Sequence, residues 1–291
     1  MLNRRDVLEL AAAAVAISGG QLAAGTDSAT DRPADFEIVD TNVSLFRWPF
    51  RRLPLDETDK LVGKLRSLGV TQAWASSFEA VLHRDLASVN QRLAETCREF
   101  PELIPMGAVN PALPGWESDL RRCVEDFNMP GIRLLPGYHG YPLDDSRIPE
   151  LLKRAATAGV VVQIAMSLED PRTQSELVRI ADVDLSRLLP LLPKVPHARV
   201  QILNQKLRAP LLTQLAKLPG VYVDTARVDG TDAVPKLARS VAAGRVLFGS
   251  HSPFLIPEAA LIRTHESGLL DDAGLRAVLA GNAREFLELN S

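Results

Sequence analysis

Polar side chains that could carry acid–base chemistry stand at the ends of short apolar segments. The clearest case is residues 246–254, Val-Leu-Phe-Gly-Ser-His-Ser-Pro-Phe, where an apolar run breaks abruptly into a polar turn. His251 in this turn is a candidate general base, because an imidazole titrates near neutral pH. Asp40 or Asp224, each ending another such segment, is a candidate carboxylate to orient the imidazole.

A second set of polar residues follows, or lies within, the other apolar segments and is predicted to bind substrate. The set is Asn42, Ser44, Arg133, Tyr138, His139, Asn204, Arg227 and Ser250. The two arginines suit an anionic substrate. Arg133 lies inside an apolar segment, so we expect it to meet a carboxylate, a ligand or solvent. Asn42 and Asn204 could hydrogen-bond each other.

The residues available do not predict a metal centre or another cofactor. A divalent metal in an enzyme needs clustered imidazoles and carboxylates, and only His139 and His251 fall near the segment ends. The two cysteines, Cys97 and Cys123, both fall in helical-looking segments and are expected to be buried free thiols. We therefore expect chemistry or binding without a metal.

Eight short strands alternating with helices are predicted to position these residues. The predicted strands are 36–40, 70–75, 103–109, 130–135, 160–164, 200–203, 221–224 and 245–248. Helical spacing of apolar residues follows the strands, and after the fifth strand an insertion at residues 168–192 is expected to contain a helix that begins near Ser175. This order predicts an α/β protein with a (β/α)8 TIM barrel, in which the strand ends meet at one mouth. An open doubly wound sheet is less favoured, because no glycine-rich phosphate loop follows the first strand.

The N-terminal residues are predicted to lie outside the barrel, which spans residues 35–291. Arg4 and Arg5 precede an alanine-rich apolar run at residues 10–17, too short for a stable membrane anchor. This pattern resembles a twin-arginine export signal, so we expect a signal peptide at residues 1–24, a linker at residues 25–34, and an exported, periplasmic or extracytoplasmic protein. The alternative is an unprocessed N-terminal tail.

The composition of the chain limits the classes of partner that we expect. The chain has 291 residues and a net charge of -3, which gives no reason to expect nucleic acid. No later segment is long and apolar enough to be a membrane span. A small-molecule ligand or substrate is therefore the expected partner, and a homo-oligomer is compatible with the sequence.

Several short motifs, taken in order, resemble the amidohydrolase-related (amidohydrolase 2) family. They are residues 38–44 (Ile-Val-Asp-Thr-Asn-Val-Ser), 109–111, 131–136, 159–164, 245–254 and 281–286. The resemblance runs over residues 38–286 and implies the same barrel fold with a hydrolase or decarboxylase function. In that family the first strand carries two histidines that bind a metal, and the eighth strand carries a catalytic aspartate.

The resemblance places other residues at these family positions. The paired histidines fall on Asn42 and Ser44, the fifth-strand histidine on residues 165–166, the sixth-strand histidine on Asn204, and the aspartate on His251. Amide and hydroxyl groups are poor ligands for zinc. The sequence therefore favours a hydrolase-like function on a small carboxylated or cyclic (lactone or amide) substrate without a catalytic metal. The alternative is a catalytically inactive relative that binds a small ligand or a protein partner.

Overall fold

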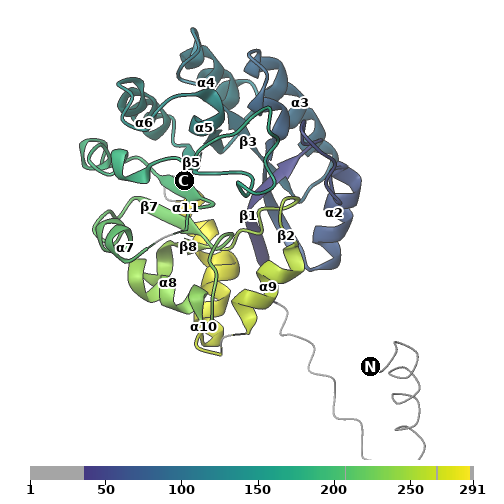
Figure 1. Ribbon diagram of the computed structural model, residues 1–291, viewed down its shortest axis with the longest axis vertical. Helices are drawn as coiled ribbons and strands as arrows, with labels where there is room; N and C mark the ends of the chain where they lie inside the picture. The colour runs from purple at the N-terminus through teal and green to yellow at the C-terminus, as the bar shows by residue number, and fades with distance from the viewer. Residues whose placement is uncertain (1–35, 207, 267, 289–291) are drawn as a thin grey trace, which may run out of the picture. The chain divides into compact units, whose positions relative to one another are not determined.

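Eight parallel strands form a barrel in the computed structural model, which describes residues 36–206, 208–266 and 268–288 (Figure 1). The strands are β1 Ile38–Leu45, β2 Val70–Ser77, β3 Leu103–Ala108, β4 Gly131–Leu134, β5 Val161–Ala165, β6 Val200–Leu203, β7 Val221–Asp224 and β8 Val246–Leu247. They pair in chain order from β1 to β8. The backbone N–H of Thr41 donates to the carbonyl of Phe248 at 2.9 Å, which joins the first strand to the last. The predicted TIM barrel is confirmed.

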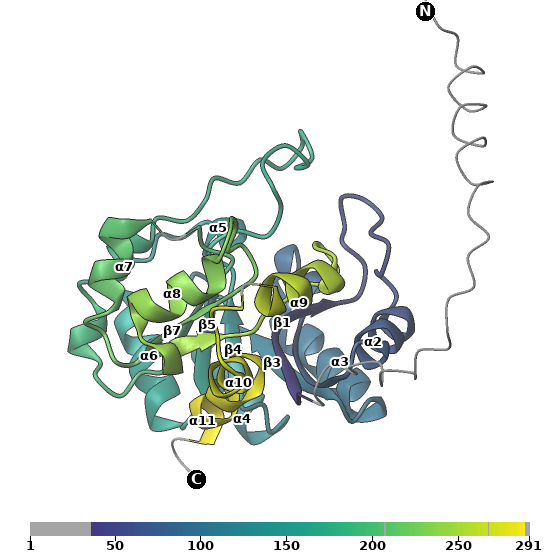
Figure 2. The same cartoon turned by 90° about the horizontal axis from the view of Figure 1, so that it is seen from below.

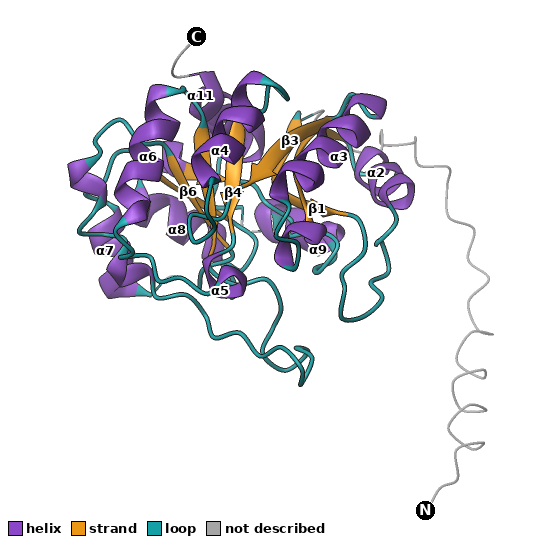
Figure 3. Cartoon of the chain, turned by 90° about the horizontal axis from the view of Figure 1, so that it is seen from above, coloured by secondary structure: helices purple, strands orange, loops and turns teal. Residues whose placement is uncertain are grey.

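Helices surround the strands on the outside of the barrel (Figures 1 and 3), except that the last helix lies at one end of the barrel, where Phe286 packs against Trp74 and Tyr222. They are α2 Thr58–Ser67, α3 Leu86–Glu99, α4 Trp116–Glu125, α5 Pro136–His139, α6 Arg147–Thr157, α7 Ala209–Leu215, α8 Ala233–Val241, α9 Pro257–His265, α10 Asp272–Arg276 and α11 Asn282–Glu288. In α2, for example, Leu61, Val62 and Leu65 are buried, the spacing at which one face of a helix meets a core. Cys97 and Cys123 are both free and buried, as predicted.

Two local predictions differ from the structure. β1 continues to Leu45, past the predicted end at residue 40, and its pairing with β2 is irregular between Asp40 and Val43. Asn42 and Ser44 therefore lie inside the strand and not after it. The helix predicted near Ser175 is absent, because the Gln174 side chain instead hydrogen-bonds both the N–H and the carbonyl of Ile180 at 3.0 Å and holds a turn.

Two long loops project from the same side of the barrel, one after β1 and one after β5 (Figure 2). They rise from the carboxyl ends of the strands, the side on which TIM barrels bind ligands. No helix in the described part of the chain is long and apolar enough to cross a membrane. The predicted signal peptide and linker lie outside the described residues and stay predictions.

Candidate functional site

Asn42 is the centre of a hydrogen-bond network that joins β1, β6 and β7 at the mouth. Its Nδ2 donates to Oδ1 of Asn204 at 2.8 Å and to Oδ2 of Asp224 at 2.6 Å. The backbone N–H of Asn204 donates to Oδ1 of Asp224 at 3.1 Å. None of the three residues is more than 3% exposed. The predicted bond between Asn42 and Asn204 is therefore present, and both oxygens of Asp224 accept from amide groups.

Asp40 is fully buried and keeps one oxygen without a partner. Its Oδ1 accepts from the backbone N–H groups of Asn42 at 3.1 Å and Ser250 at 2.9 Å, whereas Oδ2 forms no hydrogen bond with any described residue. Burial raises the pKa of Asp40 to about 6 and that of Asp224 to about 7. Two carboxyl groups at the mouth therefore titrate near neutral pH.

A backbone carbonyl, and not a carboxylate, holds His251. The Nε2 of His251 lies 2.7 Å from the carbonyl oxygen of Leu168, and since a carbonyl only accepts, Nε2 carries the proton. Burial lowers the pKa of His251 to about 3. The ring is therefore neutral at physiological pH and weakly basic. Among the hydrogen bonds of the described residues none joins it to Asp40, so the two residues predicted as a base and its orienting acid do not form that pair.

Arg133 in β4 is engaged with neutral acceptors. Its Nε donates to Oε1 of Gln163 at 2.9 Å, its Nη1 to the Val43 carbonyl at 3.0 Å and to Oγ of Ser44 at 3.3 Å, and its Nη2 to the Trp74 carbonyl at 3.4 Å. The side chain is buried, and the ion pairs of the described residues do not include it. The hydrogen bonds of Arg133 go to neutral groups and not to a carboxylate, because the barrel interior itself supplies the acceptors.

The other predicted residues at the rim are also engaged. Oγ of Ser250 donates to Oγ of Ser252 at 2.7 Å, and both residues are fully buried. Nη2 of Arg227 donates at 3.1 Å to the carbonyl of Leu168, the same oxygen that holds the imidazole. These contacts place both predicted residues at the mouth.

A group of aromatic side chains, here called the cap, covers the mouth. The cap consists of Trp48, Phe50, Phe78, Tyr138 and Phe254. The ring of Trp48 lies 4.9 to 5.6 Å from the other four ring centroids, at edge-to-face angles. Phe254 also lies 5.1 Å from the His251 ring. The predicted residue Tyr138 is thus part of the cap, whereas Nε2 of its neighbour His139 lies 2.8 Å from the Ala80 carbonyl.

An ion pair joins the two projecting loops over the cap. Nε of Arg51, in the loop after β1, lies 2.8 Å from Oε1 of Glu169, in the loop after β5. The side chain of Glu169 is only 2% exposed, and the guanidinium of Arg51 lies 5.9 Å from the centre of the Phe254 ring. The mouth is therefore closed in this structure. Sequence reasoning missed the cap and this pair, although three aromatic residues within residues 46–50 were a signal in a chain that is 5% aromatic.

The donor groups at the mouth do not fit a catalytic metal. Across the described residues no three His, Cys, Asp or Glu side chains come together as a metal site would need. The carboxylate of Asp224 accepts instead from the amide of Asn42, and His251 directs its protonated nitrogen at Leu168. A site for zinc or manganese requires several imidazole or carboxylate donors that converge, and the free Oδ2 of Asp40 is a single such donor.

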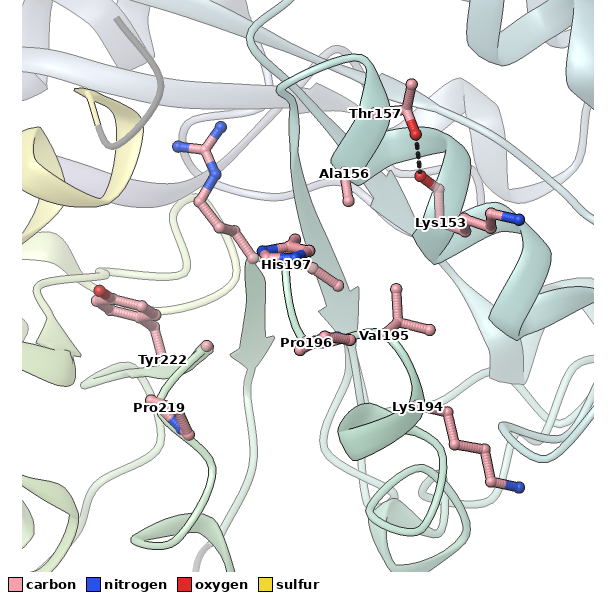
Figure 4. Close-up of a pocket in the computed structure, with 12 residues that line it drawn as sticks. Lys153, Ala156, Thr157, Lys194, Val195, Pro196, His197, Pro219 and Tyr222 are labelled. Carbon is pink, nitrogen blue, oxygen red and sulfur yellow. Dashed lines mark hydrogen bonds between the residues drawn. The ribbon is translucent and has the colours of Figure 1, made fainter.

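A separate cavity of about 680 Å³ lies before β6 and β7, at the end of the barrel opposite the mouth (Figure 4). Basic residues line it, but their charges do not converge. Figure 4 shows the side chains of Lys153 and Lys194 directed away from His197. Arg199 donates from Nη1 to the carbonyls of Phe286 at 2.6 Å and Leu287 at 3.0 Å. This cavity therefore lacks the focused charge of an anion site.

Residues 46–289 match the sequence model of the amidohydrolase family. This chain belongs to that family. The match covers the barrel from the loop after β1 onward, so it includes the ends of β2 to β8 and leaves out β1, which carries Asp40 and Asn42. Among curated proteins, none matches the sequence.

Solved structures of other proteins share the fold of this chain. The 2,6-dihydroxybenzoate decarboxylase from Rhizobium is 14% identical, with a TM-score of 0.67 over 88% of this chain and 100% of the other. The dihydroxybenzoic acid decarboxylase from Polaromonas, solved with manganese and 2-nitroresorcinol, is 15% identical, with a TM-score of 0.66 over 88% and 98%. Amidohydrolase 2 from Bifidobacterium longum subsp. infantis is 16% identical, with a TM-score of 0.60 over 88% and 100%. At these identities the likeness shows the fold alone.

Proposed function

We propose that this protein is a metal-independent member of the amidohydrolase family that binds a small molecule at the barrel mouth. The observation that carries the proposal is the amide of Asn42, whose Nδ2 lies 2.6 Å from Asp224 and 2.8 Å from Asn204. The neutral amide of Asn42 therefore occupies the position beside the Asp224 carboxylate that a metal cation would need. Ligand binding is supported by buried polar atoms without partners, which are rare in folded proteins.

Hydrolysis without a metal is a second candidate, and Asp40 is the observation that favours it. Oδ2 of this residue is unpaired, and burial raises the pKa of the carboxyl to about 6, so most of it is ionised at pH 7.5. A carboxylate of this kind can take a proton from an attacking water. Asp40, and not His251, would then be the general base. A cyclic lactone or amide suits such a site better than a carboxylated substrate, because Arg133 is already engaged.

Turnover assays on the full-length protein separate these candidates. We expect no hydrolysis of a lactone and amide panel and no decarboxylation of 2,6-dihydroxybenzoate, either in EDTA or with added Zn²⁺ or Mn²⁺. Hydrolysis in EDTA that is lost in Asp40→Asn, but kept in the control Asp145→Asn just before α6, would establish the metal-free enzyme. Turnover that arises only with added metal would contradict both candidates.

A further inference from the structure

The polar residues of the mouth are sealed from solvent by the cap. Asp40, Asn42 and His251 are each no more than 1% exposed. Trp48, the central ring of the cap, is 2% exposed and packs at 4.9 Å on Phe254, whose ring lies 5.1 Å from that of His251. A small molecule can therefore reach these residues only when part of the cap moves.

Residues 47–51, here called the strap, carry Trp48 and belong to the loop that projects from the barrel after β1 (Figure 2). No backbone hydrogen bond of the described residues joins the strap to another segment. The contacts that hold it on the cap come from side chains, the ring of Trp48 and the guanidinium of Arg51. Segments with few backbone hydrogen bonds are those that open locally at the lowest free energy.

Fixed contacts flank the strap on both sides. On one side, the guanidinium of Arg92 lies 4.7 Å from the centre of the Phe46 ring. On the other side, Oδ2 of Asp56 accepts from Nε of Arg52 at 2.6 Å and from the N–H of Leu53 at 3.2 Å, which closes a turn. The strap therefore spans two anchored ends, so that it can move while β1 and α2 stay in place.

The ion pair between Arg51 and Glu169 fastens the strap to a fixed part of the barrel. Nε of the arginine and Oε1 of the glutamate lie 2.8 Å apart, and the two side chains are 39% and 2% exposed. The residue before Glu169 is Leu168, whose carbonyl accepts from Arg227 at 3.1 Å and lies 2.7 Å from Nε2 of His251. The glutamate is thus held in place, and the arginine is the partner that can leave the pair for solvent.

Two features of the closed strap are unfavourable. Phe46, where the strap begins, has a φ of 68°, in the left-handed region that an aromatic residue rarely adopts. Nε1 of Trp48 is buried and makes no hydrogen bond with a described residue, which is unfavourable for a donor. When the strap opens, this nitrogen meets water. Aromatic packing and the ion pair with Glu169 therefore offset both features in the closed state.

We infer that the strap is a lid over the mouth, latched by Arg51 and Glu169, and that it opens about its anchored ends to admit a small molecule. This inference rests on the proposed binding of a ligand at the mouth, to which it adds the route of entry. Opening carries Trp48 out of the cap and into solvent.

Hydroxyl-radical footprinting of the full-length protein, read by mass spectrometry, measures this opening through the oxidation rate of Trp48. Trp74 on β2, fully buried, is the internal reference. Arg51→Gln leaves the buried Glu169 carboxylate without its charged partner, so we expect Trp48 to be oxidised about tenfold faster or more than in the wild type, with Trp74 unchanged. Glu169→Gln keeps an acceptor for the arginine and should give a smaller rise. Arg47→Gln, at an exposed arginine of the same strap, is the matched control and should have no effect.

Equal oxidation of Trp48 in Arg51→Gln and in the wild type would overturn the latch, as would an equal rise in the control Arg47→Gln. A rise that Trp74 shares in the same proportion would show that the barrel opens as a whole, and would overturn the strap as a separately moving segment. Failure of the proposed function itself has a different signature, namely turnover that depends on added Zn²⁺ or Mn²⁺. The two failures are therefore distinguishable.

Discussion

Replacing Arg133 by methionine is expected to lower the free energy of unfolding by about 3–5 kcal/mol. Methionine fills much of the volume of the side chain but leaves the acceptors on Gln163, Ser44 and Trp74 without their donor. It also removes the positive charge that acts on Asp40 and Asp224. Chemical denaturation followed by circular dichroism measures the loss.

The matched control is Arg154→Met. Arg154 lies on the surface of α6, 2.8 Å from Glu150, with the two side chains 50% and 47% exposed. Exposed pairs of this kind contribute below about 1 kcal/mol, so we expect a small effect. If Arg133→Met were no more destabilising than this control, the buried arginine would not be part of the structural network described above.

Asp40→Asn is expected to make the protein more stable than the wild type at pH 8 and about equally stable at pH 4. Burial raises the pKa of Asp40 from 3.8 to about 6, so the folded state holds this proton more tightly than the unfolded state does. The contribution of the protonated Asp40 carboxyl to the free energy of unfolding is complete below pH 3.8 and is lost as the pH rises through about 6. A shift of this size corresponds to at most about 3 kcal/mol. Asparagine keeps the acceptor for Asn42 and Ser250 without an ionisable group.

Asp145→Asn provides a control with the opposite sign. The side chain of Arg147 lowers the pKa of Asp145 to about 2, so that carboxylate stabilises the fold at neutral pH and loses this effect in acid. Unfolding free energies at several pH values between 4 and 8 give both profiles. Between pH 4 and 7, the free energy of unfolding of the wild type should fall relative to that of Asp40→Asn. If it does not, Asp40 ionises in the folded protein as easily as in the unfolded one.

The barrel was predictable because its signals are local and repeated. Apolar segments such as residues 200–203 and 221–224, bounded by turn residues, match β6 and β7 to the residue. Strand order then follows from alternation with helices, and the position of a polar residue at a strand end predicts that it lies at the mouth. This topology brings Asn42 and Asn204 to the same mouth, where the predicted hydrogen bond between them is present.

The closure of the mouth and the partners of its buried side chains were not predictable, since they depend on contacts between segments distant in the chain. The acceptors for Arg133 come from β1, β2 and β5, and a single-strand pattern does not contain them. The cap unites aromatic residues from the loops after four different strands, and the partner of His251 is a backbone carbonyl. The missing helix near Ser175 has a local cause instead, because the side chain of Gln174 closes a turn with Ile180.

Metal analysis of the purified full-length protein tests the central claim most directly. After incubation with excess Zn²⁺ or Mn²⁺ and removal of unbound metal, we expect well below one equivalent retained per chain, because the amide of Asn42 already donates to Oδ2 of Asp224 at 2.6 Å. One equivalent of tightly held metal that is lost in Asp224→Ala would contradict it.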